Sequence, residues 1–196
     1  LTMHKKKLYH LTSQNFKFPL YIDQHRQVIT ASGQNLPMMQ WPDGRWCFPA
    51  NIYMLELFRR GLSHQNRGGT LLAYATNISH LIRYCYDNQI DFIALTDNEF
   101  TFFIKVLQGE RRSKYPEVQA RDANSVIAIG RNCLDFLACV GRFYDDESFI
   151  GQKGRIRAEH KEFEIRSEGL RRGKGKLIRK YWHHHAFPTP DPKNKR

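Results

Sequence analysis

The chain has 196 residues, of which 41% are hydrophobic, 13% aromatic and 26% charged. This composition predicts one globular domain of ordinary size, or a small domain with an appendage, and excludes disordered and fibrous classes. Lys and Arg number 31 against 19 acidic residues, which gives a formal charge of +12. Such an excess indicates a polyanionic partner and carries no information about the fold.

Nothing in the sequence predicts a membrane-spanning segment or a secretion signal. No apolar run approaches the roughly 18 residues that a membrane span needs, and no apolar segment follows the basic start. We therefore expect no membrane contact and a cytoplasmic location. The four cysteines form no C-x-x-C pair, so reduced structural thiols are expected.

The basic excess is concentrated in the C-terminal part of the chain. Residues 1–50 carry a net charge of +4, residues 51–150 carry −1, residues 151–182 carry +7 and residues 183–196 carry +2. Solvated tails are the simplest explanation of such charge runs. A nucleic-acid contact is the alternative.

The opening residues favour β structure. Residues 18–23 and 27–30 combine β-branched and aromatic side chains with turn residues between them. Residues 38–41 and 45–48 flank a Pro-Asp-Gly turn in the same way. We expect one or two hairpins within residues 1–48.

Helical periodicity begins at residue 49 and predicts four helices, at about 49–61, 70–88, 97–109 and 122–144. Thr96 and Glu99 form a capping-box pattern before the third of these. The predicted core faces are Ile52, Leu55, Phe58 and Leu62; Leu71, Ala75, Ile78, Leu81, Ile82 and Cys85; Phe100, Phe103, Ile104 and Leu107; and Val126, Ile127, Cys133, Leu134, Leu137 and Val140. The pattern indicates a mainly α fold built on a compact four-helix bundle.

No catalytic or cofactor motif is present in the sequence. Gly-rich nucleotide loops, the hydrolase G-x-S-x-G and the metalloprotease H-E-x-x-H are all absent. His183, His184 and His185 are the only candidate metal ligands. Three consecutive imidazoles point in diverging directions, whereas a zinc site needs converging ligands. We expect neither a metal nor a cofactor.

Two predicted helix faces have the side chains of a DNA-binding surface. Hydroxyl, amide and Arg side chains suit phosphate oxygens and base edges. On the second helix these residues are Arg67, Thr70, Asn77 and His80, and on the fourth they are Arg121, Asn124 and Arg131. The N-terminus of the fourth helix would also favour a phosphate. Taken alone, each face is better explained as ordinary solvated surface, and it is their combination with the basic segments that favours DNA.

A basic extension follows the predicted helices. Residues 146–182 interleave Arg and Lys with glycine and end on aromatics. Its candidate phosphate contacts are Lys153, Arg155, Arg157, Arg171 and Arg172. We expect them to supply affinity without sequence specificity. Residues 155–166 keep neither a period of two nor one of 3.6, so a strand pair and a helix both remain open.

The middle of the chain resembles a known family. Gly61-Leu-Ser63, the run from Thr70 to Cys85 (TLLAYATNISHLIRYC) and Ile90-Asp-Phe-Ile-Ala-Leu-Thr96 are similar in spacing to the core-binding domain of tyrosine recombinases, the phage-integrase family. The likeness covers about residues 49–145. It implies a small SAM-like helical bundle that grips duplex DNA through its second and fourth helices. Family members assemble as tetramers on paired sites, so a homo-oligomer on DNA is implied as well.

The resemblance assigns no catalytic residue to this chain. In the family an Arg, a Lys, an H-x-x-R and a nucleophilic Tyr lie in a separate C-terminal domain, which we expect beyond residue 196. Two H-x-x-R strings, His64 to Arg67 and His80 to Arg83, do occur. Both fall inside the core-binding pattern, and two such strings are unremarkable in a chain rich in His and Arg.

The expected organisation is a β-leaning segment (1–48), a helical core-binding domain (49–145), a basic extension (146–182) and a linker (183–196). The expected function is that of the DNA-binding part of an integrase, acting in DNA integration and recombination of a mobile element. Two alternatives remain: a self-contained nucleic-acid-binding regulator, and a protein-interaction bundle with basic tails.

Overall fold

A computed structural model describes residues 6–112, 115–165 and 177–192 of the chain. It divides into two compact units, Leu1–Asp91 and Phe92–Arg196. Each unit is described by itself below.

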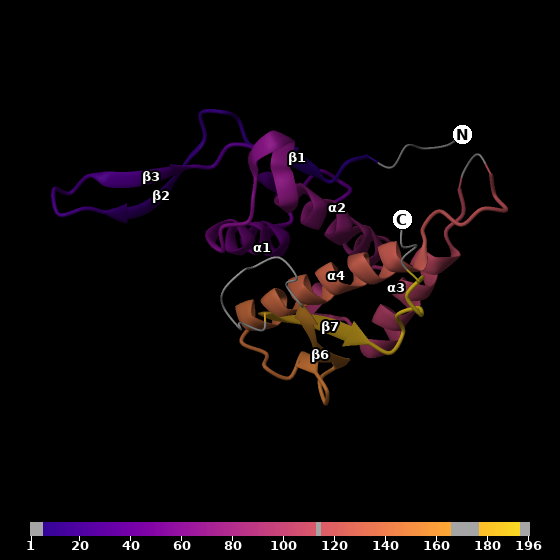
Figure 1. The fold of residues 1–196 in the computed structure, drawn as a ribbon. Coiled ribbons are helices and arrows are strands. Elements are labelled where there is room, and N and C mark those ends of the chain that lie inside the picture. Colours follow the sequence, from indigo (N-terminus) through magenta and orange to yellow (C-terminus); the bar gives the residue numbers. More distant parts are fainter. Residues whose placement is uncertain (1–5, 113–114, 166–176, 193–196) are drawn as a thin grey trace. The chain divides into compact units, whose positions relative to one another are not determined.

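The first unit combines four short strands with two helices (Figure 1). The elements are β1 (Tyr9–Leu11), β2 (Lys17–Ile22), β3 (Val28–Ser32), β4 (Pro37–Met39), α1 (Phe48–Arg59) and α2 (Gln65–Asp87). β1 pairs antiparallel with β4, and β2 pairs antiparallel with β3. The hairpin predicted over 18–30 is therefore confirmed. Its turn is stabilised by Asp23, whose Oδ1 accepts hydrogen bonds from the N–H groups of His25 and Gln27, both at 2.8 Å.

The second predicted hairpin, 38–41 with 45–48, forms only as a short ladder. Its arms pair at Gln40 and Trp46, where the N–H of Trp41 donates to the carbonyl of Arg45 at 2.8 Å and the N–H of Cys47 donates to the carbonyl of Met39 at 3.0 Å. Met38 also pairs with His10 of β1, which was not predicted. The local turn does form, because the Oδ1 of Asp43 accepts the N–H of Arg45. The strand cannot extend further, since α1 starts at Phe48.

The core of this unit lies between α1, α2 and β4. All six residues of the core face predicted for α2 are buried. The predicted phase of α1 is wrong: its buried residues are Ala50, Asn51, Tyr53, Met54 and Leu57. Asn51 explains the rotation, because its side chain accepts the N–H of Met39 at 2.6 Å and donates to the carbonyl of Met39 at 3.1 Å. A polar residue satisfied in this way can occupy the core.

The second unit packs two helices against a three-stranded sheet (Figure 1). Its elements are the 3₁₀ turn η1 (Phe92–Ala94), α3 (Asp97–Gly109), α4 (Ala123–Phe143), β5 (Ile150–Gly151), β6 (Ile156–Ile165) and β7 (Leu177–His184). The strand order is β5-β6-β7, with β5 parallel to β6 and β6 antiparallel to β7. α4 packs on α3, β5 and β7.

Both helices of this unit begin as the sequence predicts. At α3 the hydroxyl of Thr96 accepts the N–H of Glu99, and the Glu99 carboxylate accepts the N–H of Thr96 at 2.7 Å. At α4 the Asp122 carboxylate accepts the N–H of Ser125 at 2.6 Å. The core faces predicted for both helices are buried. Caps and a 3.6-residue period are local signals, which explains why these two predictions succeed.

The predicted fold class is wrong. The described residues form four α-helices and three separate sheets, so the fold is mixed α and β and is not a mainly α, SAM-like four-helix bundle. The helices divide between the two units, and residues 156–165 and 177–184 pair as long strands that complete the second core.

All four cysteines are free and buried, and burial raises the pKa of Cys47 to about 12. No described helix combines the length and apolarity needed to cross a membrane.

Candidate nucleic-acid interface

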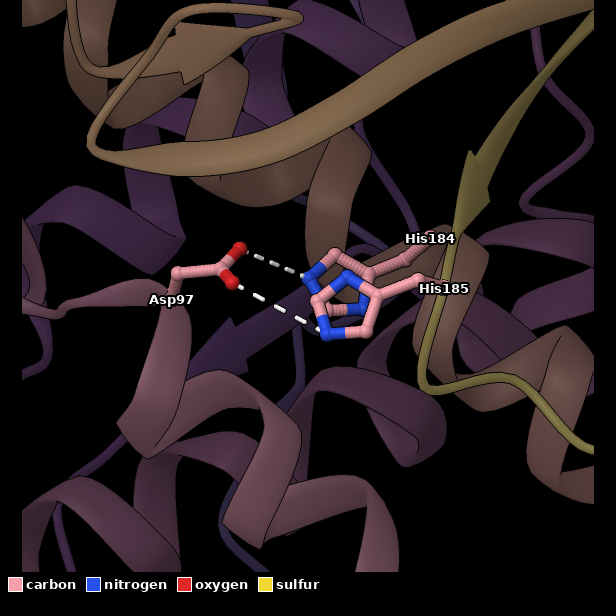
Figure 2. Close-up of side chains that lie close together, drawn as sticks. All are labelled: Asp97, His184 and His185. Atoms are coloured by element: carbon pink, nitrogen blue, oxygen red, sulfur yellow. Dashed lines mark hydrogen bonds and ion pairs between the residues drawn. The ribbon is translucent and has the colours of Figure 1, made fainter.

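Asp97, the first residue of α3, connects that helix to the sheet. Its N–H donates to the carbonyl of Arg155 at 3.1 Å. Its Oδ1 accepts the N–H of Arg157 at 2.7 Å and a hydrogen bond from Nε2 of His184 at 3.0 Å. One side chain therefore links α3 to the beginning of β6 and the end of β7 (Figure 2).

Hydrogen bonds at both ring nitrogens assign the tautomer of His184. Its Nδ1 accepts the N–H of Ala186 at 3.1 Å and must therefore lack a proton. The proton of the neutral ring then lies on Nε2 and is donated to Asp97. The ring is 1% exposed and packs edge-on against Phe100, with 4.9 Å between ring centroids. His184 is thus a fully satisfied core histidine.

The environment shifts the pKa values of both partners downward. Burial lowers the pKa of His184 because it disfavours the charged ring, and the hydrogen bond that the ring donates to Asp97 opposes this only in part. Burial alone would raise the pKa of Asp97, but the Arg157 N–H and the His184 ring outweigh it and hold this pKa below its usual value. Both groups are therefore in their favoured states at neutral pH, a neutral imidazole and a carboxylate.

Asp97, His184 and His185 could each offer one metal-ligand atom, and these atoms lie within 4.8 Å of one another. The hydrogen bonds do not fit a metal. Coordination through Nε2 of His184 would move its proton to Nδ1, where it would face the N–H of Ala186. Two donors would then oppose each other in the core. His185 is exposed, and its Nε2 lies 3.3 Å from the hydroxyl of Thr101.

Strand alternation gives the β6–β7 hairpin two different faces. Ile156 and Ala158 are buried, as is His184, which pairs directly with Ala158. Residues of the other parity therefore lie on the opposite side of the two strands. They are Arg157, Glu159, Lys161 and Phe163 on β6 and Arg179, Tyr181 and His183 on β7.

This second face is basic and aromatic, and with Arg131 of α4 it is called the basic face below. Among its described residues, four cations (Arg131, Arg157, Lys161 and Arg179) stand against one carboxylate. That carboxylate, Glu159, is paired with Lys161 at 3.5 Å. Phe163 is 59% exposed. The opposite face carries Lys180 and Glu162, which pair with each other at 3.5 Å. The positive charge of the hairpin is therefore concentrated on one side.

Arg131 joins this face from α4. Its guanidinium carbon lies 4.1 Å from the centre of the Tyr181 ring, a cation–π geometry that orients the guanidinium plane. Its Nε is buried with no hydrogen-bond partner in the part of the chain that the structure describes. The charge of Arg131 also acts on the ring of His183, as do the charges of Lys161 and Glu159. The structure thus brings Arg131 and Arg157, two predicted site residues from distant positions, to one surface.

Two other predicted arginines of the second unit already bind partners within the protein. Arg121 forms an ion pair with Glu110. Arg155 binds the carbonyl of Ile93 and the carboxylate of Asp146. Lys153 is exposed.

The N-terminus of α4, where a phosphate was expected, is occupied by carboxylates. The Asp191 side chain accepts the N–H of Ala123 at 3.2 Å, and the Asp191 carbonyl accepts a hydrogen bond from Asn124 at 3.3 Å. The Asp122 side chain takes the N–H of Ser125. These contacts satisfy the helix end without a phosphate.

The remaining predicted residues belong to the first unit or lie outside the described part. Thr70 is exposed on α2, and Asn77 and His80 are half-buried on the same helix. Arg67 lies in the first turn of α2, but its side chain lies outside the described part, as do Arg171 and Arg172.

The sequence-based prediction missed Lys161, Arg179, Tyr181 and His183, which belong to the basic face. The available signal was the spacing of Arg157, Lys161 and Phe163 at even intervals. Glutamates occur at both odd and even positions (159, 162 and 164), so the alternation is not evident from the sequence.

Comparisons of the chain with protein-family models, with curated proteins and with solved structures gave no match.

We expect His184→Ala to lower the free energy of unfolding by about 2–4 kcal/mol, because it removes a buried ring and leaves the Ala186 N–H without its acceptor. Urea unfolding of the whole chain measures this. His185→Ala is the matched control, since that ring is exposed, and a change within about 0.5 kcal/mol is expected. Equal effects of the two substitutions would contradict the structural role of His184.

Acid should destabilise the chain through the same histidine. The pKa of His184 is lower in the folded chain than its usual 6.5, so between these values the unfolded state binds more protons. The free energy of unfolding is then greatest above about pH 6.5 and decreases as pH falls toward the folded pKa. His183, whose pKa is lowered by burial and by Lys161, acts in the same direction. Urea titrations between pH 8 and pH 5 should show a smaller pH slope for His184→Gln than for the wild type, and an unchanged slope would be contrary evidence.

Zinc should not stabilise the chain. A ligand that binds only the folded state raises the free energy of unfolding by about 2.7 kcal/mol at a hundredfold excess over its Kd, and the tautomer of His184 opposes such binding. We expect equal thermal unfolding midpoints with equimolar Zn²⁺ and with EDTA. A higher midpoint with zinc that His185→Ala abolishes would show that these residues do form a metal site.

Proposed function

We propose that this chain is the DNA-binding part of a tyrosine-type site-specific recombinase. It holds duplex DNA, in the cytoplasm and at the nucleoid, while a catalytic domain elsewhere in the protein performs strand exchange. No described residue is assigned to catalysis.

The basic face carries the DNA-binding part of this proposal. Four cations and an exposed aromatic ring lie on one side of a two-stranded ribbon, whose other side is anchored to a core. Cations spaced along a ribbon can follow successive phosphates, and a two-stranded ribbon fits into the major groove of duplex DNA. The remaining positive charge of residues 151–182 adds to the same electrostatic attraction.

The recombinase part rests on the sequence pattern of residues 61–96. The helical bundle that this resemblance implied is wrong, so the resemblance supports the function through spacing alone. The basic face lies outside the resembling segment and supports DNA binding independently of it.

Salt dependence tests the DNA-binding proposal. The logarithm of the duplex association constant should fall with the logarithm of salt concentration, with a slope of about −0.9 for each phosphate contact. Arg179→Ala, which removes one exposed cation of the basic face, should flatten this slope by about one unit. Fluorescence anisotropy with the whole chain measures both quantities.

Lys105→Ala is the matched control, because Lys105 is exposed on α3 and lies outside the basic face. It should leave the slope unchanged. Equal slopes for Arg179→Ala and the wild type would place the DNA contact elsewhere. Polyglutamate that competes as strongly as duplex DNA would favour an acidic protein partner.

A further inference from the structure

A hollow of about 410 Å³ lies between the start of β6 and the end of β7. It is lined by Gln152, Arg157, Ala158, Glu159, His183 and His185. A single water occupies roughly 30 Å³ in the liquid, so the hollow admits a larger polar group.

Two side chains of the hollow hold donors with no partner among the described residues. Arg157 is exposed and forms no ion pair within the described part of the chain. His183 is half-buried and its ring approaches Phe187 edge-on. The ring nitrogens make no hydrogen bond to another described residue. The amide of Gln152 adds a third donor. An oxyanion is the ligand that accepts from all three.

The backbone of the hollow is fixed before any ligand binds. The N–H of Arg157 is bound to Asp97, and the neighbour of His183 on β7, His184, is bound to the same carboxylate. Glu159, the acid of the hollow, is paired with Lys161. The backbone that carries Arg157 and His183 is thus fixed, and the opposing charge is already compensated.

We propose that this hollow is the seat of one phosphodiester group of duplex DNA, bound by the guanidinium of Arg157 and the imidazole of His183. This inference rests on the proposed DNA-binding function and names a specific contact within it. Arg157 supplies a bidentate, permanently charged donor, and His183 supplies a second donor from the opposite strand.

Binding at this seat takes up a proton on His183. The free ring is surrounded by Lys161 and Glu159 on β6, Arg131 on α4, and His185 and Arg157 at the hollow itself. Burial and the charges of Lys161 and Arg131 lower the pKa of the His183 ring more than Glu159 raises it, so the ring is neutral at pH 7. A phosphate adds a negative charge beside the ring and favours its protonated form. Affinity therefore rises as pH falls.

The first test compares two arginines of the basic face. Arg157→Gln should weaken duplex binding by about tenfold, because it removes a charge-assisted contact inside the hollow. Arg179→Gln removes the same charge outside the hollow and should cost about threefold or less. Both variants keep the backbone N–H groups, so the Asp97 hydrogen bonds persist, and circular dichroism checks the fold. Equal losses in the two variants would overturn the proposal while leaving DNA binding intact.

The second test places a small ligand in the hollow. Diethyl phosphate, a monoanionic phosphodiester, should shift the NMR signals of the His183 ring and leave those of His25 unchanged. Arg157→Gln should abolish the shift. Wild-type duplex affinity should be about threefold or more higher at pH 6.0 than at pH 8.0, and His183→Gln should remove this difference.

The outcomes separate the two proposals. Tight duplex binding without any change at His183 means that the hollow is not the seat, although the proposed function stands. A diethyl phosphate shift without duplex binding means that the hollow binds another oxyanion and that the DNA-binding function is wrong.

Discussion

The hydrogen bonds of Asp97 are the constraint on which the second unit depends. A carboxylate at the first residue of α3 benefits from the positive end of that helix, and the same side chain accepts from the backbone of β6 and from a ring on β7. These partners lie 60 and 87 residues away along the chain. Without them, a hairpin as polar as residues 156–165 with 177–184 has little apolar surface to attach it to α3 and α4.

The anchoring also decides which side of the hairpin faces solvent. Once Ile156, Ala158 and His184 are buried, the period of two sends Arg157, Lys161 and Arg179 outward. A slip of one residue in register would exchange the two faces and bury unpaired cations, at a cost far above any gain from pairing. The burial of Ile156, Ala158 and His184 therefore determines where the basic face lies.

Local signals explain what the sequence predicted well. The capping box at Thr96 and the buried faces of α2, α3 and α4 depend on residues within one or two turns of each other. The predictions that failed concern distant partners. The pairing of β4 with β1, about 28 residues upstream, was not predicted, and α1 is rotated by one buried Asn51 that binds Met39. The sequence of residues 155–166 did not distinguish a strand from a helix, because Ile156 and Ala158 differ in parity from Phe163 and Ile165. Only the pairing with β7 defines the strand over its full length. Arg131 and Arg157 of the candidate site were predicted from the sequence. The surface that contains both residues was not predicted, because it forms only when β6 pairs with β7.

The three consecutive histidines show how strand geometry separates residues that the sequence presents as equivalent. His184 points into the core and is neutral, whereas His183 and His185 line the hollow. Protonation has opposite consequences at the two positions. A charged His184 would lose the hydrogen bond from Ala186 and weaken the anchor, while a charged His183 would strengthen the proposed phosphate contact. Neither residue could exchange roles with the other, because the buried position demands an acceptor at Nδ1 and the hollow demands a free donor. Unfolding through His184 therefore sets an acidic limit to the pH range in which protonation of His183 can strengthen the proposed phosphate contact. A step of one residue along β7 separates the two effects.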